Sequence, residues 1–105
     1  MKYMLADLSR KKSIQALAAA IPRPLDLLIN NAATAVRRRR ETAAGIELQF
    51  ATNVLGYFWM IQACADHLSA APAARVVNVA SYWAGGLDMD DPECKLPRLA
   101  AGGTD

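Results

Sequence analysis

Asp7, Asn30, Asn31 and Ser81 each follow a short apolar run of the sequence. A serine hydroxyl in such a place can donate a hydrogen bond to a ligand oxygen, and an asparagine loop can line a cofactor crevice. The alternative is a set of ordinary turns, because Asn tolerates left-handed backbone and bonds its own chain. No Ser-His-Asp pattern marks Ser81 as a nucleophile. The single histidine, His67, falls near the end of a predicted helix, where we expect it to be exposed.

Asn53 stands on the apolar stripe of a predicted helix. A buried amide without hydrogen bonds costs about 1–3 kcal/mol, so Asn53 needs partners. One interpretation is a core asparagine satisfied by backbone or water. The other is an amide that orders a water molecule or a catalytic partner.

The apolar runs have the length and composition of buried strands. Residues 3–6 read as the end of a strand, and residues 25–29 form a near-continuous apolar run. Residues 75–79 are rich in β-branched side chains. Continuous apolar runs are typical of parallel strands that are covered on both faces.

Two amphipathic stretches separate these strands. Ser9 can cap the first helix, which Pro22 and Pro24 end, and Thr42 can cap the second, which Pro72 ends. The second helix carries a long apolar stripe: Ile46, Phe50, Asn53, Tyr57, Ile61, Cys64 and Leu68. Strands that alternate with helices predict an α/β fold with a parallel sheet. Ligands of such sheets bind beyond the carboxyl ends of the strands, where the polar residues named first lie.

The composition predicts one small intracellular domain. The chain has 105 residues, 53% of them hydrophobic, and a net charge of +2, which is too small to recruit nucleic acid by bulk charge. Cys64 and Cys94 show no metal-ligand spacing, and we expect two reduced thiols and no metal site. Because we find neither a secretory signal nor a membrane span, we expect a cytoplasmic protein.

Four segments resemble, in order and spacing, the middle of the short-chain dehydrogenase/reductase family, close to its retinol-dehydrogenase-like members. They are Asp7-Leu8 and residues 25–33, 45–58 and 75–81. The resemblance implies a partial doubly wound parallel sheet, an incomplete Rossmann fold, over residues 1–95. We expect residues 96–105 to form a disordered tail.

The resemblance also implies a binding site for NAD or NADP. Asp7, with Leu8 beside it, would bond the adenine ring of the cofactor. The backbone of Asn30, Asn31 and Ala32 would border the adenosine ribose.

Two further residues match the catalytic machinery of that family. Asn53 matches the helix asparagine that holds a water molecule of the proton relay. Ser81 matches the serine that donates a hydrogen bond to the substrate oxygen, an established way to stabilise developing charge. The implied substrate is a small alcohol/carbonyl pair.

The sequence also departs from the family pattern. It contains no G-x-G-x-x-G loop for the pyrophosphate and no Tyr-x-x-x-Lys pair for acid–base catalysis. Tyr82 adjoins Ser81, Lys95 has Asp91 four residues before it, and Ala33 replaces the usual loop glycine. We therefore expect a fragment of an NAD(P)-dependent oxidoreductase that is inactive alone, and that binds the cofactor poorly.

An alternative function is protein binding. The long helix commonly builds the dimer interface in the resembled family, so the chain could be a non-catalytic module that pairs with a full-length relative. Nucleic-acid binding through Arg37–Arg40 is disfavoured, because no aromatic residues interleave with the run, and we expect a solvated loop.

The strand order adds a physical expectation. In the family the strand that ends at residues 3–6 is separated from residues 25–29 by two strands that this sequence lacks. Residues 3–6 should then stay unpaired or move beside residues 25–29. An unpaired strand edge would leave the chain poorly folded or self-associating.

Overall fold

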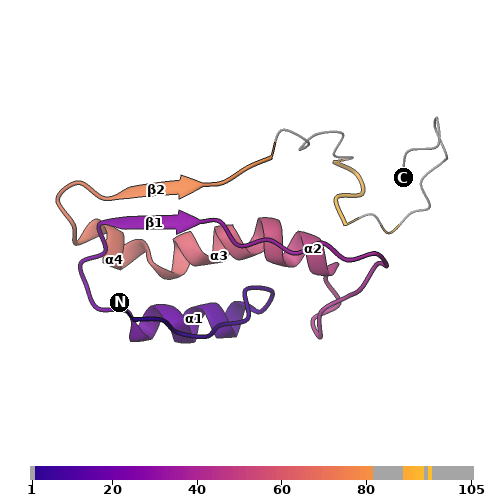
Figure 1. Ribbon diagram of the computed structural model, residues 1–105, viewed down its shortest axis with the longest axis horizontal. Coiled ribbons are helices and arrows are strands. Elements are labelled where there is room, and N and C mark those ends of the chain that lie inside the picture. Colours follow the sequence, from indigo (N-terminus) through magenta and orange to yellow (C-terminus); the bar gives the residue numbers. More distant parts are fainter. Residues whose placement is uncertain (1, 82–88, 94, 96–105) are drawn as a thin grey trace.

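Two parallel strands with helices on one side of them make up the fold (Figure 1). In this computed structural model, residues 2–81, 89–93 and 95 are described. The elements are α1 (Lys11–Ala20), β1 (Leu27–Asn30), α2 (Leu48–Phe50), the π-helical segment η1 (Ala51–Leu55), α3 (Gly56–Ala63), α4 (Ala65–Ser69) and β2 (Arg75–Asn78). The predicted α/β class with an incomplete Rossmann sheet is confirmed. The predicted tail over residues 96–105 lies outside the described residues.

The sheet consists of β1 and β2, which run parallel as predicted. Leu27 pairs with Arg75 at one end, and Asn30 pairs with Asn78 at the other. The Val79 amide donates to the Asn30 carbonyl at 2.9 Å and extends the ladder by one bond. Both strands therefore end at the same edge of the sheet.

Residues 3–6 do not form the predicted strand end. They form neither helix nor strand and have no strand partner, and Leu5 is 93% exposed. A strand needs the backbone groups of a neighbour, and β1 pairs only with β2 among the described residues. Of the two arrangements expected for this stub, the unpaired one is observed.

The core lies between α1 and α3. Ile14 and Ala18 from α1 meet Met60 and Cys64, and all four are buried. Leu28 packs against this cluster from β1. Figure 1 shows α3 between β1 and α1, so the helices cover one face of the sheet.

The second helical stretch begins at Glu47, so the prediction of a Thr42 cap was wrong. The Glu47 carboxylate accepts hydrogen bonds from the amides of Gln49 (2.9 Å) and Phe50 (2.7 Å). A carboxylate there satisfies open N–H groups and interacts favourably with the helix dipole. The Thr42 hydroxyl instead accepts from the Ile46 amide within the preceding turn. The stretch is also not one continuous α-helix, since the π-helical segment η1 lies between α2 and α3, and the helix breaks at Cys64.

His67 is buried, with 6% of its surface exposed, so the expectation of an exposed histidine was wrong. Its Nε2 lies 3.0 Å from the carbonyl oxygen of Ile21 and therefore donates to it. Its own carbonyl accepts from the Leu25 amide at 2.9 Å. His67 thus ties the connection between α1 and β1 to α4.

Gly56 lets the start of α3 approach the turn before α1. A Cβ at this position would lie 2.7 Å from the Leu8 carbonyl oxygen. We expect Gly56→Ala to lower the free energy of unfolding by about 1–2 kcal/mol. Overpacking costs about 1–3 kcal/mol, and the better helix propensity of Ala offsets at most about 1 kcal/mol of this cost. Urea unfolding measures this loss. Gln62→Ala on the exposed side of α3 is the control, and an unchanged or raised midpoint for Gly56→Ala would contradict the close approach.

Candidate functional site

Two asparagines pair at the carboxyl edge of the sheet. Asn30 Nδ2 donates to Asn78 Oδ1 at 2.8 Å, and the Asn30 side chain is buried. The strand register places them opposite each other as the last residues of β1 and β2. The pair therefore fixes where the loops after both strands begin.

The loop after β1 is held by side chains from the second helical stretch. Asn53 Oδ1 accepts from the Thr34 amide and Asn53 Nδ2 donates to the Thr34 carbonyl, both at 2.9 Å. The Tyr57 hydroxyl donates to the Ala32 carbonyl at 3.0 Å. Asn53 therefore has the backbone partners that one interpretation of the sequence required. It lies in η1, and π-helical segments often occur at functional sites.

Leu8, Asn30, Asn31 and Ala32 line one small hollow of about 90 Å³ next to Gly56 and Tyr57. They include four of the five residues for which the sequence predicted a cofactor role. The fifth, Asp7, does not line the hollow. The structure thus brings these four positions to the carboxyl edge of β1.

The Asp7 carboxylate accepts hydrogen bonds from within its own turn. Asp7 Oδ1 accepts from the Ser9 hydroxyl at 2.6 Å and from the Ser9 amide at 3.0 Å. The hydroxyl bond and then the amide bond hold the pKa of Asp7 below its usual value. Ser9 is therefore a partner of Asp7 and not the helix cap that the sequence suggested, since the residue at the cap position is Arg10.

We expect Ser9→Ala to raise the pKa of Asp7 toward that of a free aspartate. A depressed folded-state pKa stabilises the turn above the unfolded pKa, and this stabilisation is lost as the pH falls through the folded pKa. Carboxyl chemical shifts followed from pH 7 to pH 2 measure the change. Ser69→Ala is the matched control and should leave the Asp7 titration unchanged. An unaltered Asp7 pKa in Ser9→Ala would contradict the hydroxyl as the main cause.

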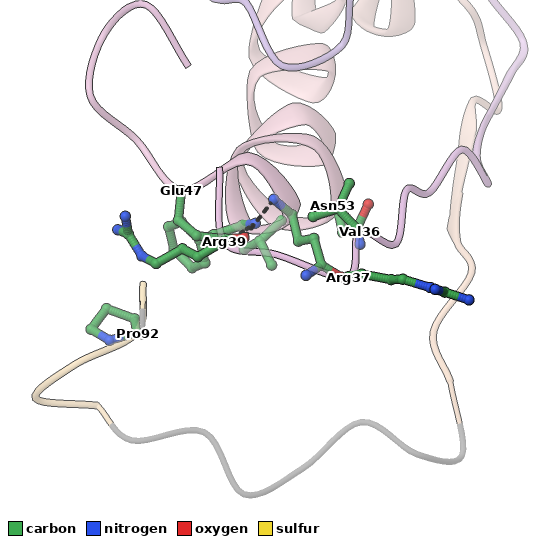
Figure 2. A pocket seen from close by; sticks show the side chains of 9 residues that line it. Val36, Arg37, Arg39, Glu47, Asn53 and Pro92 are labelled. Atoms are coloured by element: carbon green, nitrogen blue, oxygen red, sulfur yellow. Dashed lines mark hydrogen bonds between the residues drawn. The ribbon is translucent and has the colours of Figure 1, made fainter. Parts of the chain in front are cut away.

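Asn53 also lines a second hollow, of about 400 Å³, which Figure 2 shows from close by. Phe50, Val54 and Val36 supply apolar walls, and Arg37 brings a positive charge. Arg39 lines the same hollow, but its guanidinium is 2.6 Å from Glu41. That ion pair raises the pKa of Arg39 and lowers the pKa of Glu41.

Ser81 and Asn53 do not line a common hollow in the described part of the chain. Ser81 is exposed, three residues beyond the end of β2, and it does not line the hollow that contains Asn53. Pro92, from the far side of the undescribed residues 82–88, lines that hollow instead, across from Asn53 in Figure 2. The structure therefore brings one of the two predicted catalytic residues to a hollow and leaves the other outside it.

Three participants were missed by reasoning from the sequence: Asn78, Tyr57 and the backbone of Thr34. A signal for Asn78 exists, because two paired four-residue strands each end in Asn. Tyr57 follows Asn53 by four residues, a spacing that points both side chains to one face of a helix. Nothing in the sequence marks Thr34.

Within the described residues, no cluster of three or more His, Cys, Asp or Glu side chains could hold a metal ion. Cys64 is a buried free thiol whose pKa is raised by burial, and Cys94 lies outside the described residues. No helix in the described part of the chain is long and apolar enough to cross a membrane.

Comparison with known proteins places this geometry in a family. Residues 1–87 match the model of the short chain dehydrogenase family. Human retinol dehydrogenase 13 is 38% identical over 90 residues, covering 81% of this chain and 27% of that protein. A probable oxidoreductase of Streptomyces lividans is 38% identical over 89 residues, covering 82% of this chain and 30% of that protein. The crystal structure of an uncharacterized protein from Mycobacterium paratuberculosis superposes with a TM-score of 0.75 at 30% identity, covering 90% of this chain and 34% of that one. The chain thus spans between a quarter and a third of the length of these relatives.

Proposed function

Because this chain belongs to the short-chain dehydrogenase family, we propose that it forms part of an NAD(P)-dependent oxidoreductase acting on an alcohol/carbonyl pair. The observation that supports this most is the shared hollow of Leu8, Asn30, Asn31 and Ala32 at the carboxyl edge of the sheet. Cofactors of doubly wound folds bind at that edge. The predicted cytoplasmic location is part of the same proposal.

The types and places of these residues support a site for the adenosine part of the cofactor. Leu8 and Ala32 would give apolar contact, and Asn31, the first residue after β1, would border the ribose. When bound, the nicotinamide would supply or accept the hydride. The sequence has no G-x-G-x-x-G loop, so the pyrophosphate has no cradle within these residues.

Asn53 and Ser81 are proposed to serve the substrate side. Each end of the Asn53 amide uses one hydrogen bond on Thr34 and keeps capacity for another, where a relay water could bind. The Ser81 hydroxyl would donate to the substrate oxygen. The sequence has no Tyr-x-x-x-Lys pair to act as acid and base, so we propose that the chain does not turn over alone.

Two measurements test this proposal. Mixed with NADPH and an aldehyde, the chain should oxidise no cofactor above the blank rate, and clear oxidation would overturn the proposed inactivity. In an NMR titration, adenosine and NAD⁺ should both shift the amide signals of Leu8, Asn31 and Ala32.

The two affinities should agree within about threefold, because the rest of the dinucleotide lacks a cradle. Ala32→Leu should fill the hollow and remove the shifts, whereas Ala35→Leu, an exposed position in the same loop, should retain them. Shifts that survive in Ala32→Leu would refute the adenosine site.

The second candidate function is pairing with a full-length relative through the long helix. Val54 and Phe58 lie four residues apart on η1 and α3, and both are more than half exposed. The proposed pairing would cover this apolar pair in a homo- or hetero-oligomer. In co-purification with a full-length relative, Phe58→Ser should lose the complex, whereas Gln62→Ser should keep it. Retention by both variants would exclude this surface.

A further inference from the structure

A third hollow, of about 480 Å³, opens between the start of α1 and the turn before α2. Arg10, Lys11 and Lys12 line one side of it, and Thr42, Ile46 and Trp59 line the other. It shares no lining residue with the hollow at the edge of β1 or with the one that contains Asn53. Nothing in the proposed oxidoreductase function uses it.

The positive charge around this hollow forms no ion pair within the described residues. Among the described residues, no carboxylate lies within ion-pair distance of Arg10, Lys11 or Lys12, and the hollow has no acidic lining residue. Asp7 is the nearest acid along the chain. Its carboxylate is hydrogen-bonded to Ser9, and it also attracts Arg10 without forming an ion pair, so Lys11 and Lys12 are the cations without an acidic partner among the described residues.

These three cations also stand where a helix disfavours them. Positive side chains at a helix N-terminus each cost about 0.3–1 kcal/mol against the helix dipole. The N-terminus of α1 has no side-chain cap and no acidic residue in its first turn. A bound anion would relieve both the repulsion and the open N–H groups.

The opposite wall of the hollow is apolar with one hydroxyl. Trp59 and Ile46 are partly buried there. Thr42 Oγ1 accepts a bond from the Ile46 amide, which leaves its O–H proton available to donate. The hollow thus combines several cationic donors with an aromatic surface.

We propose that this basic hollow binds a phosphate-bearing ligand whose apolar part packs on Trp59. A phosphate monoester carries about −1.5 to −2 charges and three acceptor oxygens. It can therefore accept hydrogen bonds from several cationic donors at once, more than a single carboxylate ligand can. The volume of the hollow exceeds what one phosphate fills, which leaves room for an apolar portion on the indole. The ligand could be a soluble phosphate ester or the headgroup of a phosphate-monoester lipid.

Fluorescence of Trp59 tests the proposal in the full chain. Trp83→Phe removes the only other tryptophan of the sequence, so that emission reports on the hollow. Phenyl phosphate is the soluble probe, and phosphatidylcholine vesicles with and without phosphatidic acid test the lipid source. We expect saturable quenching by phenyl phosphate that weakens as salt is raised.

Matched charge variants separate the hollow from bulk charge. Lys11→Gln with Lys12→Gln should weaken binding at least about tenfold, whereas Arg37→Gln with Arg38→Gln, which removes the same charge outside the hollow, should change it less than about twofold. Far-UV circular dichroism confirms that both variants keep the helices. The proposal would be overturned if neither phenyl phosphate nor phosphatidic acid vesicles gave saturable quenching. It would also be overturned if both double variants lost binding affinity equally. Quenching by phosphatidic acid vesicles alone would support the hollow and assign the lipid source.

Discussion

The 105-residue chain is expected to self-associate, and Ile29→Lys is expected to weaken that association at least about tenfold. Ile29 is 56% exposed on the sheet face opposite the helices, and its register partner Val77 is exposed beside it. Among the described residues, no helix covers that face, and both strands have an open outer edge. Exposed apolar strands with free edges are templates for pairing with another chain.

A charge at the neighbouring position serves as the control. Leu28 points to the other face and packs against the core cluster between α1 and α3. Leu28→Lys should therefore abolish cooperative unfolding, because it buries an unpaired charge. Ile29→Lys should keep the helical signal while reducing the mass measured by light scattering. A soluble monomer with a cooperative melt for the unaltered chain would contradict this expectation.

The strands are the part of the fold that sequence patterns predicted best. Residues 25–29 and 75–79 are apolar enough to be recognised without neighbours, and β1 and β2 lie within two residues of those limits. The alternation with helices also predicted their parallel direction. Local composition was sufficient to locate the strands. Their parallel direction followed from the order strand–helix–strand, because a helix that connects two strands of one sheet makes them parallel.

Features that depend on distant contacts were not predictable in the same way. Residues 3–6 have a strand-like composition, but they lack a partner and form no strand. His67 looks like an exposed histidine at a helix end, yet the Ile21 carbonyl comes from 46 residues earlier in the chain to meet it. Glu47 is an unusual cap by type, and only the turn between Thr42 and Ile46 delivers it to the helix start.

The candidate site likewise contains features that local sequence predicts and features that depend on distant contacts. The positions at strand ends follow from the apolar runs, which is why Asn30 and Asn31 fall on the hollow. The bonds of Asn53 to Thr34 join residues 19 positions apart, and no local pattern indicates them. Asn53 holds the loop after β1 through Thr34. The proposed catalytic role would come in addition to this structural one.

Replacing Asn53 is the change with the largest effect expected at the site. Asn53→Leu keeps similar volume but leaves the amide and the carbonyl of Thr34 without their partners. An unmade hydrogen bond of this kind costs about 1–3 kcal/mol. The loop after β1 should therefore open more often, and hydrogen exchange at the Thr34 amide should accelerate roughly 5- to 150-fold, the ratio that corresponds to that free energy.

The matched control is Gln62→Leu, which removes an exposed amide on α3 whose side chain makes no hydrogen bond to a described residue. It should leave exchange at Thr34 unchanged. Tyr57→Phe adds a graded test, because it removes only the bond to the Ala32 carbonyl and leaves both Asn53 bonds in place. Tyr57→Phe should affect the loop less than Asn53→Leu does, since it removes one hydrogen bond and Asn53→Leu removes two. If Thr34 exchanges equally fast in the unaltered chain and in Asn53→Leu, the loop is held by something other than this amide, and the positioning role assigned to Asn53 fails with it.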